Sequence, residues 1–157
     1  MKPRVYLETT IPSYLAARPS RELVLAGQQE ATRDWWETQR TEHDLYVSDL
    51  VVEEVSKGDG ETAKVRLSLI EPLPMLKATD EAGEVAGRLL AAGVIPSVAA
   101  ADALHIAIAT VHGMDFLLTW NCRHINNAHS VRRIEKLCRE MGHVCPVICT
   151  PEELMEV

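Results

Sequence analysis

The stretch of sequence that decides the fold is Val98–Thr119, which reads VAAADALHIAIATVHGMDFLLT. Its first part is almost continuously apolar and rich in alanine, so it predicts a helix that is buried nearly all round. Gly113 favours the end of that helix, and the apolar residues Phe116–Thr119 then predict a short buried strand. A buried helix followed at once by a buried strand is typical of a sheet that helices cover on both faces.

One carboxylate lies within this apolar helix, at Asp102. Burying an ionised carboxylate is costly unless the carboxylate is paired or bound to a metal ion. At roughly 100° per residue, Asp102 shares one stripe of the helix with His105, Ala109 and His112, and this stripe is the only polar side. Asn121 follows the predicted strand. The helix and strand together are therefore expected to place the Asp102 carboxylate near the start of a helix and the Asn121 amide at the end of a strand.

Composition excludes several classes of protein. The chain has 157 residues, which predicts a single domain over residues 1–157 with a core of its own. Hydrophobic residues make up 46% and charged residues 25%, as in soluble globular proteins, and the formal net charge of −7 excludes a global attraction for nucleic acid. The sequence shows neither a signal peptide nor an apolar run long enough to span a bilayer, so we expect a cytoplasmic protein without a membrane partner.

Sulfur and indole side chains are expected to pack in the core rather than to carry chemistry. The sequence lacks the close cysteine pairs that zinc sites use, which predicts small buried residues at Cys122, Cys138, Cys145 and Cys149. Trp35 and Trp36 have no basic cluster beside them, so packing is favoured over stacking on bases.

Apolar strands alternate with helices along the rest of the chain. Strands are predicted at Arg4–Leu7, Leu45–Val47, Phe116–Thr119 and Val144–Cys149, with a weak edge strand in Glu71–Leu76, where two prolines exclude a central strand. Helix caps are expected at Ser48 or Asp49, at Thr79, at Pro96-Ser97 for the central helix, and at Ser130. This alternation predicts an α/β fold, with three layers (α/β/α) around a central, mainly parallel sheet of four to five strands.

Acidic and amide side chains gather where these strands end. In a parallel sheet, sites form at the carboxyl ends of the strands, where the strand order reverses. Glu8 and Asn121 each follow a predicted strand, and Glu54 and Asp102 lie in helices that begin at that edge. Helical geometry places Glu54 about 70° and Glu53 about 170° from the centre of their helix's apolar face, so Glu54 is expected to reach the site and Glu53 to face water.

Three carboxylates that converge repel one another, and a divalent cation resolves that conflict. Oxygen ligands without a dedicated Cys or His set favour Mg²⁺ or Mn²⁺. The sequence therefore predicts a metal site built from Glu8, Glu54, Asp102 and Asn121.

Four blocks of sequence, taken together, point to a known family. They are YLETT at 6–10, SDLVVEEV at 48–55, AAADALHIA at 99–107 and LLTWN at 117–121. In this order and spacing they resemble the PIN domain and, within it, the VapC-type toxin ribonucleases. The resemblance spans nearly the whole chain. It implies a three-layer fold, Mg²⁺- or Mn²⁺-dependent endonuclease activity on RNA, a homodimer and often an antitoxin protein as partner.

The resemblance also assigns roles to single residues. The family's first three acids fall on Glu8, Glu54 and Asp102 and its fourth acidic position falls on Asn121, which makes these four the implied metal ligands and catalytic residues. Two departures stand out. The family's first acid is usually aspartate, so the carboxylate of Glu8 is displaced by one methylene, or over about 1 Å. Asn121 removes a charge, and both departures leave the number of metal ions open.

Neighbouring side chains are expected to assist this site. Thr9, Thr10 and Thr119 are candidates to hydrogen-bond water or phosphate, and His105 is expected to support a ligand rather than to act as a general base. Arg123 is a candidate phosphate contact. It opens the locally basic segment 123–140, for which a solvated helix face is an equally good explanation.

Two functions from different classes remain open on the sequence alone. One is a metal-dependent endoribonuclease, the toxin of a toxin–antitoxin pair, with RNA as substrate. The other is a catalytically weak PIN-like module that acts by binding RNA or protein. Divalent-metal titration combined with an RNA cleavage assay separates the two.

Overall fold

The structure is a computed structural model, and it describes residues 1–156. Five strands form one sheet: β1 (Arg4–Leu7), β2 (Asp44–Ser48), β3 (Met75–Leu76), β4 (Phe116–Leu118) and β5 (Val147–Cys149). All neighbouring strands pair in parallel, in the order β3-β2-β1-β4-β5. The chain thus builds outward from β1 to β3 and then returns to the other side of β1, so the strand order reverses between β1 and β4.

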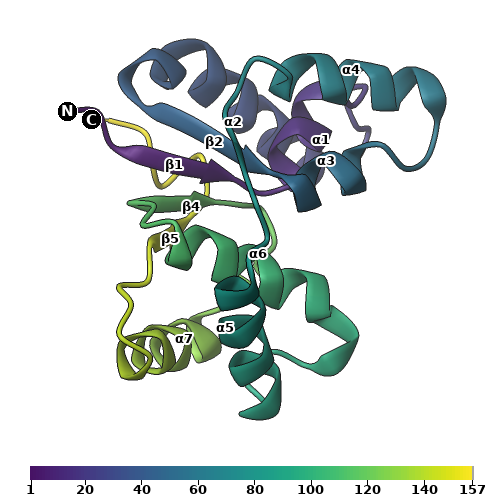
Figure 1. Cartoon of the computed structure of the whole chain (residues 1–157). Coiled ribbons are helices and arrows are strands. Elements are labelled where there is room, and N and C mark those ends of the chain that lie inside the picture. The colour runs from purple at the N-terminus through teal and green to yellow at the C-terminus, as the bar shows by residue number, and fades with distance from the viewer. Residues whose placement is uncertain (157) are drawn as a thin grey trace.

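Helices cover both faces of this sheet. They are α1 (Thr10–Ala16), α2 (Leu23–Gln39), α3 (Asp49–Val55), α4 (Gly60–Ile70), α5 (Asp80–Ala91), α6 (Ala100–Val111) and α7 (Ala128–Glu140), with 3₁₀ turns η1 (Arg40–Glu42) and η2 (Ser97–Ala99). Figure 1 shows α1 to α4 on one side of the strands and α5 to α7 on the other. This confirms the predicted three-layer α/β/α fold with a parallel sheet.

The central helix is buried as its composition predicts. Within α6, every side chain from His105 to Thr110 is buried, and α5 packs along it. The helix ends where expected, because Gly113 takes a positive φ of 69° that favours glycine. In β1, Val5, Tyr6 and Leu7 are fully buried, which explains why this strand is apolar at successive positions rather than at alternate ones.

Two of the expected helix caps are wrong. Ser97 does not cap the central helix; it begins η2, and α6 starts at Ala100 without a side-chain cap. Ser130 does not cap α7, because Asn127 accepts the N–H of His129 over 2.9 Å and starts the helix earlier. Asparagine is as good an N-cap as serine, so the sequence alone did not separate the two positions.

Other boundaries follow the prediction closely. Ser48 accepts the N–H of Val51 over 3.2 Å and caps α3, and Thr79 caps α5 in the same way. The last strand is shorter than expected, because it begins at Val147 rather than Val144. The proline at position 146 has no N–H for a sheet ladder, which accounts for the late start.

The cysteines and tryptophans behave largely as expected. Cys138 and Cys149 are buried, and Trp35 lies fully buried in the core. Cys145 is only partly buried, and the prediction is wrong for Cys122, which is exposed because it lies in the turn that follows β4. Over residues 1–156, no helix is both long and apolar enough to cross a membrane.

Candidate active site

The point where the strand order reverses brings β1 and β4 together at their carboxyl ends. Leu7 pairs with Leu118, and the next residue, Glu8, donates its backbone N–H to the Leu118 carbonyl over 3.1 Å. Glu8 and Thr119 therefore leave the sheet side by side. This is the position at which parallel α/β sheets place their ligands.

The carboxylate of Glu8 is buried and held by hydroxyl groups. Its Oε1 accepts hydrogen bonds from Thr10 Oγ1 at 2.6 Å, from the Thr10 N–H at 3.2 Å and from Thr119 Oγ1 at 2.7 Å. Each hydroxyl in turn accepts a backbone N–H: Thr10 from Trp120 and Thr119 from Asn121, both over 2.9 Å. The hydroxyl groups of Thr10 and Thr119 thus link two backbone N–H groups of the turn after β4 to Oε1 of Glu8.

Glu54 lies in α3, the helix that follows β2, and two other side chains donate hydrogen bonds to its carboxylate. Its Oε1 accepts Thr9 Oγ1 at 2.5 Å and His105 Nε2 at 2.6 Å. Burial acts to raise the pKa of Glu54, but the hydrogen bonds from His105 and Thr9 outweigh it and hold the pKa below its ordinary value. Glu53, one residue earlier, is exposed and lies 4.0 Å from Lys57, as the helical angles predict.

His105 is enclosed on both sides of its ring. Nε2 faces Glu54, Nδ1 lies 2.6 Å from the Tyr6 hydroxyl, and only 1% of the residue is exposed. A general base needs a nitrogen within reach of the proton that it removes. Because both nitrogens already have partners, the geometry favours the supporting role that the sequence predicts for His105.

Asp102 lies one helical turn before His105 on the same face of α6. It is half-buried, and within residues 1–156 its carboxylate has no hydrogen-bond or ion-pair partner. A half-buried carboxylate without a partner is unfavourable unless a cation compensates its charge. Asp102 is therefore the side chain at this edge that most needs a ligand.

The donor chemistry of the site fits a hard divalent cation. The hydrogen bonds on Glu8 and Glu54 all fall on Oε1, which leaves Oε2 of each for a metal ion. Adjacent threonines, Thr9 and Thr10, hold the two glutamates. Across the described part of the chain, however, no three His, Cys, Asp or Glu side chains form a group that could hold a metal. The carboxylates would have to draw closer together around an ion.

The side chain of Asn121 has a structural role that the sequence did not predict. Its Oδ1 accepts the N–H of His124 over 3.0 Å, and its backbone carbonyl accepts the N–H of Asn126 over 2.8 Å. The side chain closes the turn after β4 in the manner of an Asx turn. A metal ion bound through Oδ1 would share that oxygen with the His124 N–H.

Sequence reasoning missed Tyr6 and Ser48, which complete the hydrogen bonding behind Glu54. The Tyr6 hydroxyl lies 2.8 Å from Ser48 Oγ, and both residues are fully buried. A signal was available, because a phenol in an otherwise apolar buried strand must find a hydrogen-bond partner.

The locally basic segment is only partly free to meet a substrate. Arg123 is exposed in the turn beside the site. Farther along α7, Arg133 donates to the Ala92 carbonyl over 3.2 Å, and Lys136 lies 3.9 Å from Glu140. Within this segment, Arg123 thus stays the candidate phosphate contact, because it is exposed in the turn after β4.

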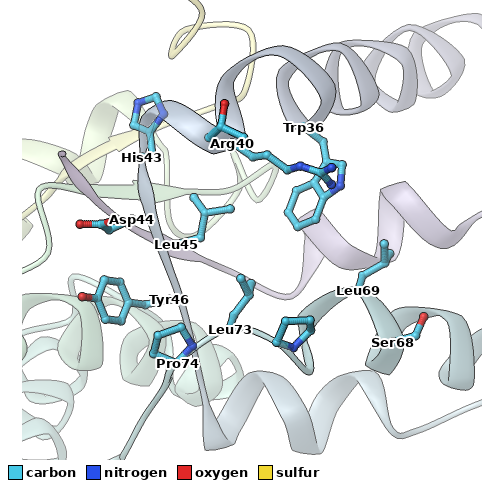
Figure 2. Close-up of a pocket in the computed structure, with 12 residues that line it drawn as sticks. Trp36, Arg40, His43, Asp44, Leu45, Tyr46, Ser68, Leu69, Leu73 and Pro74 are labelled. Atoms are coloured by element: carbon cyan, nitrogen blue, oxygen red, sulfur yellow. The ribbon is translucent and has the colours of Figure 1, made fainter.

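A well-formed pocket exists elsewhere, at the opposite end of β2. It has a volume of about 710 Å³ and lies between the end of α2, β2 and the segment before β3. Figure 2 shows Arg40 extended along Trp36, with Leu45, Tyr46 and Leu73 below them. None of the four predicted ligands lines this pocket, so it lies apart from the candidate site.

Comparisons with known proteins bear on the fold. No family model and no curated protein matches the chain. Among solved structures, VapBC2 from Rickettsia felis, bound to a DNA fragment from their promoter, aligns with a TM-score of 0.60 and 17% identity, over 94% of this chain and 98% of that one. VapC20 from Mycobacterium tuberculosis, a toxin that cleaves the sarcin–ricin loop, aligns with a TM-score of 0.60 and 12% identity, over 76% and 92%.

A third structure agrees with these two. DNA-bound VapBC from Salmonella typhimurium aligns with a TM-score of 0.59 and 12% identity, over 95% of this chain and 98% of that one. At these identities the comparison shows the fold alone. The chain has the PIN-like fold of VapC proteins, as the sequence blocks predict.

Proposed function

We propose that this chain is a Mg²⁺- or Mn²⁺-dependent endoribonuclease that hydrolyses RNA phosphodiester bonds. We further propose that it is the toxin of a toxin–antitoxin pair, with an antitoxin protein as partner, and that it acts as a cytoplasmic homodimer. The observation that carries the proposal is the carboxylate of Asp102, which has no partner among residues 1–156 and lies one helical turn before the histidine that holds Glu54, in a VapC-like fold. The solved VapC20 is itself a toxin that cleaves RNA, and two other neighbours are VapBC structures.

The residues divide the work in a simple way. Glu8, Glu54 and Asp102 would hold the cation, with Asn121 as a candidate fourth ligand. Bound there, the cation would supply Lewis acidity to activate water and to stabilise charge on the phosphate. Thr10 and Thr119 fix the Glu8 carboxylate, and Thr9 and His105 fix that of Glu54. Arg123 would be a candidate phosphate contact.

A cleavage assay tests this proposal. Purified protein is incubated with mixed RNAs in Mn²⁺, Mg²⁺ or EDTA, and cleavage is expected with either metal and not with EDTA. Glu54→Gln should abolish cleavage, whereas the matched change Glu53→Gln, in an exposed side chain on the same helix, should retain most activity. Cleavage in EDTA, or the opposite ranking of the two variants, would contradict the proposed site.

Two observations favour the second candidate, a PIN-like module that binds RNA or protein without cleaving. The described carboxylates do not form a closed metal group, and Asn121 Oδ1 is already engaged by His124. Under this alternative, RNA or a protein partner binds with equal affinity in Mn²⁺ and in EDTA, and no RNA is cleaved.

A further inference from the structure

A continuous chain of buried hydrogen bonds runs behind Glu54 and joins four elements of the fold. Ser48 ends β2, Tyr6 lies in β1, His105 lies in α6, and Glu54 lies in α3. The successive contacts are 2.8 Å from Ser48 Oγ to the Tyr6 hydroxyl, 2.6 Å from that hydroxyl to His105 Nδ1, and 2.6 Å from Nε2 to Glu54 Oε1. The first three residues are at most 1% exposed, so water does not complete these bonds.

The protons of this chain can be placed by elimination. Burial raises the pKa of the Tyr6 hydroxyl, which therefore keeps its proton, and the ionised Glu54 can only accept. Ser48 Oγ already accepts the Val51 N–H, over 3.2 Å. Nε2–H of His105 therefore donates to Glu54, and the Tyr6 hydroxyl is hydrogen-bonded to both Ser48 Oγ and His105 Nδ1.

The Glu54 carboxylate can only accept, so Nε2 of His105 carries the proton that faces it. The Tyr6 hydroxyl bonds the opposite ring nitrogen, Nδ1, and is itself bonded to Ser48 Oγ. The ring is therefore held from both sides, which fixes the direction from which Nε2–H meets Glu54.

We propose that Tyr6 and His105 are positioning residues that hold Glu54 by Oε1 and so present Oε2 in a fixed direction at the site. His105 and Thr9 approach the same oxygen, from α6 and from the start of α1, and together they restrict rotation of the carboxylate. The effect on metal binding rests on the proposed function, whereas the hydrogen bond between Tyr6 and His105 Nδ1 does not. Neither residue contacts the reacting atoms, so both act through Glu54.

The test compares two tyrosines that lie in register on neighbouring strands. Tyr6→Phe removes the hydroxyl that holds His105 Nδ1, whereas Tyr46→Phe makes the same change at the residue that pairs with Tyr6 and lines the pocket of Figure 2. The ¹⁵N chemical shifts of His105 are recorded in metal-free protein. In wild type and in Tyr46→Phe the Nδ1 signal should have the chemical shift of a hydrogen-bonded nitrogen. In Tyr6→Phe that signal should move, because Nδ1 loses its partner, while the Nε2–H signal stays in place.

Mn²⁺ affinity, measured by titration of the RNA-free protein, gives the second readout. Residues that orient a metal ligand typically change affinity by about 10–100-fold when removed. Tyr6→Phe should weaken Mn²⁺ binding by about tenfold, and Tyr46→Phe should leave it unchanged. Thermal unfolding of each variant shows whether it is folded.

A second pair of variants covers the case in which Tyr6→Phe does not fold. The amide nitrogen of glutamine can stand near the position of His Nε2 and donate to Glu54, whereas leucine cannot. His105→Gln should therefore bind Mn²⁺ more tightly than His105→Leu, although both lose the ring. A merely structural role predicts that affinity follows stability instead and that the two variants rank by melting temperature.

The two readouts separate the possible failures. Unchanged ¹⁵N signals in Tyr6→Phe, or Mn²⁺ affinity equal to wild type in both Tyr6→Phe and His105→Leu, would overturn the positioning roles. If the wild type binds no Mn²⁺ but the Nδ1 signal of His105 moves in Tyr6→Phe and not in Tyr46→Phe, the restraint on Glu54 stands and the proposed metal-dependent function fails.

Discussion

Thr119 offers the sharpest test of how the site is held together. Its side chain is fully buried, and its hydroxyl donates to Glu8 Oε1 over 2.7 Å and accepts the Asn121 N–H over 2.9 Å. Valine has nearly the same shape but neither donates nor accepts a hydrogen bond. Thr119→Val therefore removes both bonds without opening a cavity.

The expected loss of stability can be worked from these two contacts. A lost hydrogen bond to a charged group costs about 1.5–3 kcal/mol, and the unpaired N–H adds about 1 kcal/mol. The extra buried methyl group offsets about 1 kcal/mol. The net loss is about 2 kcal/mol, which for a chain of this size lowers the melting temperature by about 4–8 °C.

Thermal and urea unfolding in EDTA measure this loss, with a matched control. Thr110 is also buried, but its hydroxyl bonds back to the Ile106 carbonyl within α6, so Thr110→Val should stay within about 1 kcal/mol of wild type. In a Glu8→Met background the effect of Thr119→Val should shrink by about 1–2 kcal/mol, because the carboxylate is gone. Equal losses in both backgrounds would refute the coupling between Thr119 and Glu8.

Three further predictions concern the acids and the metal. Asp102→Asn should abolish RNA cleavage and leave the protein at least as stable as wild type in EDTA, since Asp102 has no partner to lose; a clearly lower melting temperature with activity retained would make it structural. We expect one metal ion per protomer without RNA, because the negative charges of three carboxylates do not balance the positive charges of two divalent ions. In calorimetric titration, Asn121→Asp should strengthen binding at a second metal site. Two tight equivalent sites in wild type would contradict this prediction. The pKa of Glu54 lies below its ordinary 4.5. Wild type should therefore be more stable than Glu54→Gln above about pH 5, and the difference in unfolding free energy should shrink as acid protonates the carboxylate. A difference that grows in acid would contradict this prediction.

The sequence by itself determined the layers of the fold. Local signals carry that information: the alanine-rich run before Gly113 predicts a buried helix, and short apolar runs predict buried parallel strands. It also determined which of two adjacent acids turns inward, because helical geometry alone separates Glu53 from Glu54. Caps were less certain, since Ser97 and Ser130 compete with nearby residues of similar propensity.

Only the tertiary structure decided what each carboxylate contacts. The bonds from Thr119 to Glu8 and from His105 to Glu54 join residues 111 and 51 positions apart, and no local pattern specifies them. The same holds for Tyr6, whose hydroxyl meets Ser48 and His105 only because β2 and α6 pack against β1. The sequence gives the chemical type of each side chain and the periodicity of apolar residues. The partner that a polar side chain finds across the core depends on how the packed layers bring distant groups together.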